Sequence, residues 1–319
     1  MFLRDRQFCF RYSQCVDWDL PQLRALAAAV DHGSLDAAAR ALHVTPSAVS
    51  QRLKALEQQV GAVLLQRTRP VRATEAGSAV LRLAREIDAL TADADRTLAP
   101  AGDGAWPRVR IAVNADSLAT WALPALAPLA ATTLVEFLRE DQDRTAELLR
   151  DGTAMGAVTS QAVPVQGCTV EALGTMRYHP VATRGFARRW FPDGVTREAL
   201  TRAPIVVFDD ADALQHEALR RRGVTAAPSS HVVPSSAQFA DAVRLSYGWG
   251  MLPELQVEAL AGIDDDSGPG GVTDLVLLDP SGDWHADVAL FWQQWSLRTP
   301  SLDAAADLLR TAAATSLRH

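Results

Sequence analysis

The sequence predicts an α/β protein in which a small helical module and one long helix precede a larger body of alternating strands and helices. Three observations carry this prediction. Apolar residues recur at helical spacings over residues 18–98, with turn and capping signals between the segments. From residue 109 onward, short β-rich runs alternate with helical segments, which is typical of parallel α/β sheets. The 319 residues suffice for about two domains.

The composition is that of an ordinary globular protein. Hydrophobic residues make up 48% of the chain and charged residues 22%, which excludes a disordered chain. No apolar run reaches the roughly 18 residues of a membrane span. Residues 1–17 lack periodicity and carry charges inside their apolar stretch, so we expect a disordered leader and no secretion signal. Three cysteines form no disulfide framework, which favours a reducing cytoplasm.

Three short helices are expected between residues 18 and 60. The first has an apolar face of Leu23, Leu26 and Val30 and ends before Gly33. The second runs from Asp36 to Leu42 behind the capping residue Ser34. The third begins at Pro46, because Thr45 can cap it and proline suits the first helical position.

The third helix, Pro46–Val60, has two chemically different faces. Val49, Leu53, Leu56 and Val60 cluster on one side at helical spacing. Hydrogen-bond donors occupy the opposite side, namely Ser47, Ser50, Gln51, Lys54 and Gln58. Three short helices, the last with a polar donor face, predict a helix-turn-helix.

Two short β-like pieces around Arg69-Pro70, within residues 64–74, predict a basic wing beside the third helix. A long helix follows from Glu75 to about Leu98. Its apolar residues alternate spacings of three and four, as in a heptad seam: Val80, Leu83, Ile87, Leu90 and Ala94. We expect this stripe to form a dimer, the alternative being a helix that packs on its own domain.

Charge is distributed unevenly along the chain. The net charge of −7 argues by itself against a nucleic-acid partner. Residues 46–72, however, hold five cations and one anion, whereas residues 79–319 hold 21 arginines and 31 acidic residues. The donor face of the third helix could therefore contact base edges, and the wing arginines could bind phosphates. The alternative is a solvated helix face beside a charged loop.

The body follows a linker at residues 99–107 and contains polar groups where its predicted strands end. In open α/β sheets, ligands bind outside the carboxyl ends of the strands. A helix N-terminus suits a carboxylate, and nearby acids suit a cation, so together they would suit a basic amino acid. The alternative is that these groups are capping residues and surface acids. The candidate positions are Asn114, Asp116, Ser117, Glu140, Asp141, Thr159, Asp209 and Ser235.

Motifs of the common enzyme classes are missing from the sequence. It contains no GxSxG, HExxH, phosphate-binding P-loop or CxxC motif, and its seven histidines are scattered. No catalytic residue, metal site or cofactor is therefore expected, and we predict that the protein is not an enzyme.

Specific stretches resemble a known family. The run AAARALHVTPSAVSQRLKALEQQVGAVLLQRTRPVRATEAG resembles the DNA-binding domain of LysR-type transcriptional regulators. The segments VNADSLATWALPALAPLA and EDQDRTAELLRDGTAMGAVTSQ are similar to the lysine- and arginine-responsive ArgP/LysG branch. The similarity extends over FPDGVTREAL, APIVVFD and YGWGMLPE, and it covers about residues 18–315.

The resemblance implies a domain plan. Residues 18–74 would form a winged helix-turn-helix and residues 75–98 a dimerising linker helix, followed by the hinge at 99–107. Residues 108–319 would form a two-lobed effector domain similar to periplasmic binding proteins. Lobe I would comprise about 108–165 and 272–319, and lobe II about 166–271. Such regulators usually assemble as homotetramers.

The resemblance also implies roles for single residues. Contacts of the recognition helix with DNA fall on Pro46, Ser47, Ser50 and Gln51, with Arg52 and Lys54 on phosphates and Arg67 and Arg69 in the wing. The eight candidate positions of the body fall in the effector cleft. The effector would be lysine or arginine, with histidine as a third candidate, and the controlled genes would serve amino-acid export or metabolism.

Several partners follow from this expectation: double-stranded DNA, a basic amino acid, further copies of the chain and RNA polymerase, with no membrane. The alternative function is an amino-acid-binding module that acts through a protein partner on its helical N-terminal part.

Overall fold

The computed structural model describes residues 18–66, 68–98, 106–139, 142–209, 212–225, 228–261 and 274–319. It forms two compact units, Met1–Asp95 with Arg150–Thr153, and Arg96–Leu149 with Ala154–His319. The predicted leader and most of the predicted hinge lie outside the described residues. No helix in the described part of the chain combines the length and the apolar character needed to cross a membrane.

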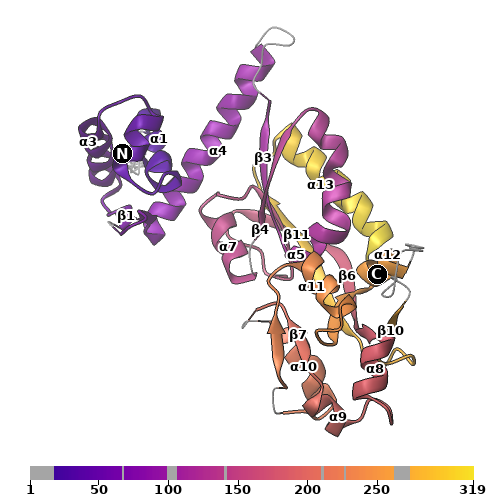
Figure 1. The fold of residues 1–319 in the computed structure, drawn as a ribbon. Coiled ribbons are helices and arrows are strands. Elements are labelled where there is room, and N and C mark those ends of the chain that lie inside the picture. Colours follow the sequence, from indigo (N-terminus) through magenta and orange to yellow (C-terminus); the bar gives the residue numbers. More distant parts are fainter. Residues whose placement is uncertain are drawn as a thin grey trace, which may run out of the picture. The chain divides into compact units, whose positions relative to one another are not determined.

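The first unit contains the predicted helix-turn-helix and wing (Figure 1). Helices α1 (Leu20–Asp31), α2 (Leu35–Ala41) and α3 (Pro46–Val60) pack around a common apolar core. Strands β1 (Leu65–Gln66) and β2 (Arg72–Ala73) form an antiparallel pair. The capping signals are used as predicted, because the Thr45 hydroxyl accepts the backbone N–H of Ala48 at 3.2 Å.

Helix α4 (Glu75–Leu98) has the predicted bounds and a divided apolar stripe. Val80, Leu81 and Ala84 are buried in the core of their own unit. Leu90 and Leu98, by contrast, are 46% and 83% exposed. The first turns of α4 therefore pack on their own unit, which was the alternative interpretation. The later turns leave apolar side chains exposed to solvent.

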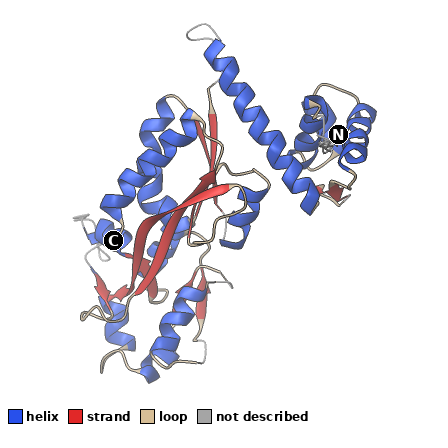
Figure 2. Ribbon diagram, turned by 180° about the vertical axis from the view of Figure 1, so that it is seen from behind, coloured by secondary structure: helices blue, strands red, loops and turns tan. Residues whose placement is uncertain are grey.

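The second unit is built on one mixed sheet (Figure 2). Its strand order is β10-β6-β11-β5-β3-β4, with β9 also paired to β6. The strands are β3 (Arg108–Val113), β4 (Leu134–Arg139), β5 (Gly156–Thr159), β6 (Cys168–Thr183), β9 (Gly250–Pro253), β10 (Leu275–Leu277) and β11 (Ala286–Trp295). Only the pairs β3–β4 and β3–β5 of this sheet are parallel in the described chain. The prediction of parallel sheets was therefore wrong for most of this sheet.

The 16-residue strand β6 was not predicted, and it belongs to both lobes. Over Cys168–Tyr178 it pairs with β11, and over Tyr178–Thr183 it pairs with β9 and β10. The strand begins just after the lobe boundary predicted near residue 166. Gly174 and Pro180, residue types that are depleted inside strands, weaken the signal that would have revealed the strand.

Helices cover the sheet and complete the second lobe, where β7 (Ile205–Val207) and β8 (Ser230–Val232) form a parallel pair. After β3, one helical stretch runs through α5 (Ala115–Ser117), the π-helix η1 (Leu118–Ala122), α6 (Leu123–Leu126) and the 3₁₀ helix η2 (Ala127–Ala131). The remaining helices are α7 (Gln142–Arg150), α8 (Arg184–Trp190), α9 (Arg197–Arg202), α10 (Ala213–Arg221), α11 (Ser236–Arg244), α12 (Glu254–Ala261) and α13 (Pro300–Ser316).

Candidate functional site

A pocket of about 410 Å³ lies between the two lobes of the second unit. The segments after β3, β5 and β7 contribute to its wall, so it lies at the carboxyl ends of these strands. Strand β9 and helix α12 also contribute residues to the wall. We call it the acidic pocket; its lining includes Asn114, Asp116, Thr145, Thr159, Ser160, Tyr178, Asp209, Asp212, Gln215, Phe239, Met251 and Gln256.

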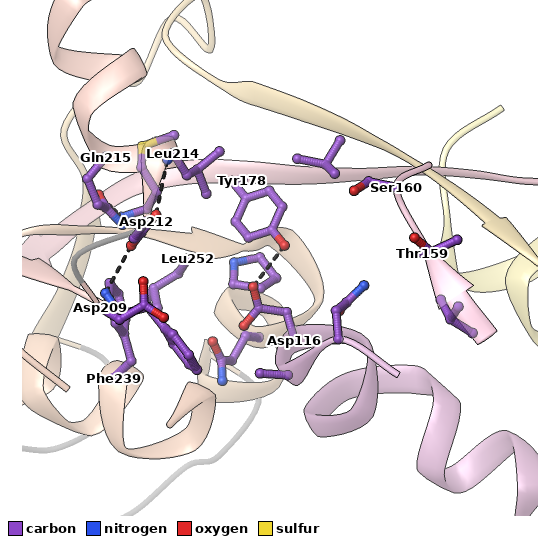
Figure 3. A pocket seen from close by; sticks show the side chains of 18 of the residues that line it. Asp116, Thr159, Ser160, Tyr178, Asp209, Asp212, Leu214, Gln215, Phe239 and Leu252 are labelled. Carbon is purple, nitrogen blue, oxygen red and sulfur yellow. Dashed lines mark hydrogen bonds between the residues drawn. The ribbon is translucent and has the colours of Figure 1, made fainter. Parts of the chain in front are cut away.

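Three carboxylates give the acidic pocket its charge. Asp209 and Asp212 lie at one end, Thr159 and Ser160 at the other, and Asp116 lies between them (Figure 3). Among the described residues that line the pocket, none is an arginine, lysine or histidine. A ligand with a positive charge would therefore meet carboxylates in the described lining of the pocket.

Asp116 is held in place by hydrogen bonds from elements that are distant in sequence. The Tyr178 hydroxyl on β6 donates to Asp116 Oδ2 at 2.8 Å (Figure 3). Burial raises the pKa of the Asp116 carboxyl, whereas hydrogen bonds from Ser236 and Tyr178 lower it and the nearby Asp212 raises it. Burial, together with Asp116, holds the Tyr178 pKa well above its usual value, so the phenol remains a proton donor.

Asp212 lines the pocket and also accepts two backbone hydrogen bonds. It caps α10, because its Oδ1 accepts the Leu214 N–H at 3.0 Å and its Oδ2 accepts the Phe208 N–H at 2.9 Å. These two bonds fix the carboxylate between the end of β7 and the start of α10. The two hydrogen bonds therefore hold the Asp212 carboxylate in a fixed position in the pocket wall.

The structure brings together four of the predicted effector positions, Asn114, Asp116, Thr159 and Asp209. It leaves Ser117 out, because this residue is fully buried and its N–H donates to Asn114 Oδ1 at 2.8 Å. The helix end predicted at Ser117 thus already has a protein partner.

Ser235 is also absent from the lining, since its hydroxyl bonds to Gln238. Its neighbour Ser236 takes the place near Asp116. The positions Glu140 and Asp141 lie outside the described residues. The pocket residues that were missed include Tyr178 on the unpredicted strand β6, Gln256 on the unpredicted helix α12, and Asp212. The capping position of Asp212 just before a predicted helix was a usable signal.

The first unit presents a second polar surface on helix α3. Val49, Leu53 and Leu56 are buried under it. The donor residues of the opposite face are all exposed: Ser47, Ser50, Gln51, Lys54 and Gln58. Pro46 is also exposed, and Arg52 is half-buried.

The charges near this surface are arranged so that cations remain available. Glu57, the acid of α3, points to the wing, where its Oε1 accepts the Leu64 N–H at 2.8 Å. Arg69 at the wing is exposed, and Arg67 lies outside the described residues. Lys54 and Arg69 form no ion pair with another residue of the described chain. The surface can therefore offer hydrogen-bond donors and free cations to an anionic polymer.

Comparison with known proteins matches both units. The family of bacterial regulatory helix-turn-helix proteins of the lysR type matches residues 20–78. The LysR substrate binding domain matches residues 102–314. The HTH-type transcriptional regulator LysG of Mycobacterium tuberculosis is 46% identical over 302 residues, covering 92% of this chain and 93% of that protein.

Solved structures agree with these matches. ArgP from Mycobacterium tuberculosis superposes with a TM-score of 0.82 at 43% identity, covering 94% of this chain and 99% of that one. Full-length LysG from Corynebacterium glutamicum, with bound effector Arg, superposes with a TM-score of 0.76 at 36% identity. That match covers 95% of this chain and all of the other.

Proposed function

Because the chain belongs to the LysR family of transcriptional regulators, we propose that lysine or arginine binds its acidic pocket and thereby controls its action on DNA. Residues 20–78 form the DNA-binding helix-turn-helix of that family, and the chain is a transcriptional regulator. The relative from Corynebacterium glutamicum is a lysine export regulatory protein, and its structure holds arginine. We propose amino-acid export genes as targets here as well.

The observation that carries the effector proposal is the set of three carboxylates, Asp116, Asp209 and Asp212, in a pocket whose described lining has no basic side chain. A basic amino acid carries two cationic groups and one carboxylate. The cationic groups would be held by the aspartates, and the carboxylate by the hydroxyls of Thr159 and Ser160 at the other end. Asn114 would complete the wall, and histidine is a third candidate ligand.

Calorimetric titration tests this proposal with arginine, lysine and citrulline. Citrulline has nearly the shape of arginine but a neutral side chain, so it serves as a control for charge. We expect arginine or lysine to bind and citrulline to bind much more weakly. Absence of binding by arginine, lysine and histidine at millimolar concentration would contradict the proposal.

The pH dependence of effector binding follows from the raised pKa of Asp116. A cation binds the ionised carboxylate, so binding must expel a proton at any pH below that pKa. We expect arginine affinity to fall on acidification, beginning at a higher pH than an ordinary carboxyl would cause. Calorimetric titrations over a series of pH values check this. If the arginine affinity of Asp116→Asn fell as steeply with pH as that of the wild type, the pH dependence would come from other groups.

The raised pKa of Asp116 has the opposite effect on the stability of the unliganded protein, which should fall as the pH rises. The folded state binds the Asp116 proton more tightly than the unfolded state does. The contribution of this group to stability therefore falls as pH rises from its unfolded pKa through its raised folded pKa. Bound arginine should offset that loss, so the stabilisation by arginine should be larger at neutral than at acidic pH.

For DNA binding, we propose that the exposed face of α3 enters the major groove and that the wing contacts the backbone. The base-contacting positions would be Pro46, Ser47, Ser50 and Gln51, and the phosphate contacts would be Arg52, Lys54, Arg67 and Arg69. The family match over residues 20–78 favours this function over an amino-acid-binding module that acts through a protein partner.

Lys54→Gln is expected to weaken binding on every DNA sequence and to reduce the slope of log affinity against log salt by about one. The reason is the loss of one exposed, unpaired cation from the DNA-facing helix. Fluorescence anisotropy at several salt concentrations measures both quantities. Arg197→Gln, which removes an exposed arginine from the other unit, is the matched control. An unchanged slope would show that Lys54 makes no phosphate contact.

We further propose that the exposed apolar side chains of α4, Leu90 and Leu98, are covered by a second copy of the chain, and that dimers pair into a homotetramer. RNA polymerase is a further proposed partner, and the cytoplasm, which holds the DNA, is the proposed location. We propose no enzymatic activity and no cofactor.

A further inference from the structure

Gln256 on helix α12 contributes an unused acceptor to the acidic pocket. The residue lines the pocket and is half-buried. Its Oε1 atom is buried and has no hydrogen-bond partner among the described residues. A buried carbonyl oxygen without a donor is costly, so it requires an explanation. A donor on a bound ligand would supply the missing partner.

The orientation of the Gln256 amide is determined by its surroundings. Its Nε2 lies 3.2 Å from the Ser236 backbone oxygen, which can only accept. Turning the amide over would place two oxygens against each other. The nitrogen must therefore face Ser236, and the oxygen is the atom left without a partner.

A directed chain of hydrogen bonds joins this amide to Asp116. Gln256 Nε2 also lies 3.5 Å from the Ser236 hydroxyl. That hydroxyl in turn hydrogen-bonds to Asp116, so it accepts from Gln256 and donates to the carboxylate. Tyr178 donates to the same carboxylate from the other side. Gln256, through its amide nitrogen, and Asp116, through its carboxylate, thus contact the same serine hydroxyl, so the two side chains are neighbours in the pocket wall.

Two neighbouring acceptors of this kind suit a ligand group with several N–H donors in a fixed plane. A guanidinium has five N–H donors in a rigid fork, whereas an ammonium is a compact point charge with three. We propose that Gln256 makes the pocket prefer arginine over lysine, by accepting an N–H of the guanidinium while Asp116 binds its charge. This inference rests on the proposed function, because it presumes that the acidic pocket binds a basic amino acid.

The test compares arginine and lysine affinities, measured calorimetrically on the full chain, for the wild type and its variants. Gln256→Met keeps the length of the side chain and removes its acceptor. We expect this change to lower the arginine affinity about tenfold, the weight of one hydrogen bond to a charged group, and the lysine affinity much less. Gln238→Met, at an exposed glutamine of α11 outside the pocket, is the control.

The ratio of the two affinities decides the outcome, because a merely structural role would change both alike. Equal losses for arginine and lysine in Gln256→Met, or an unchanged ratio, would overturn the inference. A wild-type protein that binds lysine at least as tightly as arginine would overturn it as well, and this comparison needs no variant to fold. A wild-type protein that binds neither amino acid would instead contradict the proposed function.

Discussion

Asp116→Asn is expected to remove most of the affinity for arginine while DNA binding without effector persists. The change keeps the size of the side chain but removes the charge at the centre of the acidic pocket. Loss of one partner of a buried, hydrogen-bonded charge pair costs about 2–5 kcal/mol, so affinity should fall at least about thirtyfold. Calorimetric titration with arginine measures this, and anisotropy with operator DNA checks the DNA-binding unit.

The melting temperature of the unliganded variant gives a second readout. Because burial raises the pKa of Asp116, the ionised carboxylate is unfavourable in the folded state at neutral pH. Its removal should leave the melting temperature unchanged or higher. Asp193→Asn removes an exposed carboxylate outside the pocket and should alter neither quantity. If Asp116→Asn bound arginine as the wild type does, the placement of the cation in this pocket would be wrong.

Gly77→Ala is expected to unfold the first unit or nearly so. A Cβ atom at Gly77 would lie 1.9 Å from the carbonyl oxygen of Leu64. That oxygen accepts the Thr74 N–H at 2.9 Å, and the Leu64 side chain is fully buried, so the backbone has little freedom to retreat. We expect a loss of about 3 kcal/mol or more, at the upper end of the cost of overpacking.

Calorimetry should show an early transition of the first unit in this variant, together with weakened DNA binding and retained arginine binding. Gly61→Ala is the matched control. Gly61 ends α3 at φ 75°, but no atom lies within 4 Å of the place that a Cβ would take there, so only backbone strain of about 1 kcal/mol is expected. Equal effects of the two substitutions would show that contact with Leu64 is unimportant.

The first unit could be predicted closely because its signals are local. Thr45 and Pro46 determine where α3 begins, and Val49, Leu53 and Leu56 determine which face is buried. A cap and a helical period act over a few residues, so they can be recognised in the sequence. The long helix α4 was likewise predicted with its observed bounds, Glu75–Leu98.

The second unit could be predicted less well because its pairing is not local. Strand β6 pairs with β11, which lies more than a hundred residues away in the sequence, and Gly174 and Pro180 inside β6 weaken its strand signal. Without β6, neither the antiparallel pairs nor Tyr178 in the pocket could be foreseen. Ser235 was chosen where Ser236 lies near Asp116, because the sequence places both serines at the start of the helix but does not show which of them faces the pocket.

Strand β6 is continuous and pairs with strands of both lobes, so it connects the two lobes directly. Tyr178 lies where its pairing changes from β11 to β9, since it is opposite Ala286 on one and Pro253 on the other. Any rotation of one lobe against the other must bend or twist the strand at this point. Because the Tyr178 hydroxyl donates to Asp116 from this point, a lobe rotation that bent β6 here would also move a hydrogen-bond partner of the carboxylate in the pocket.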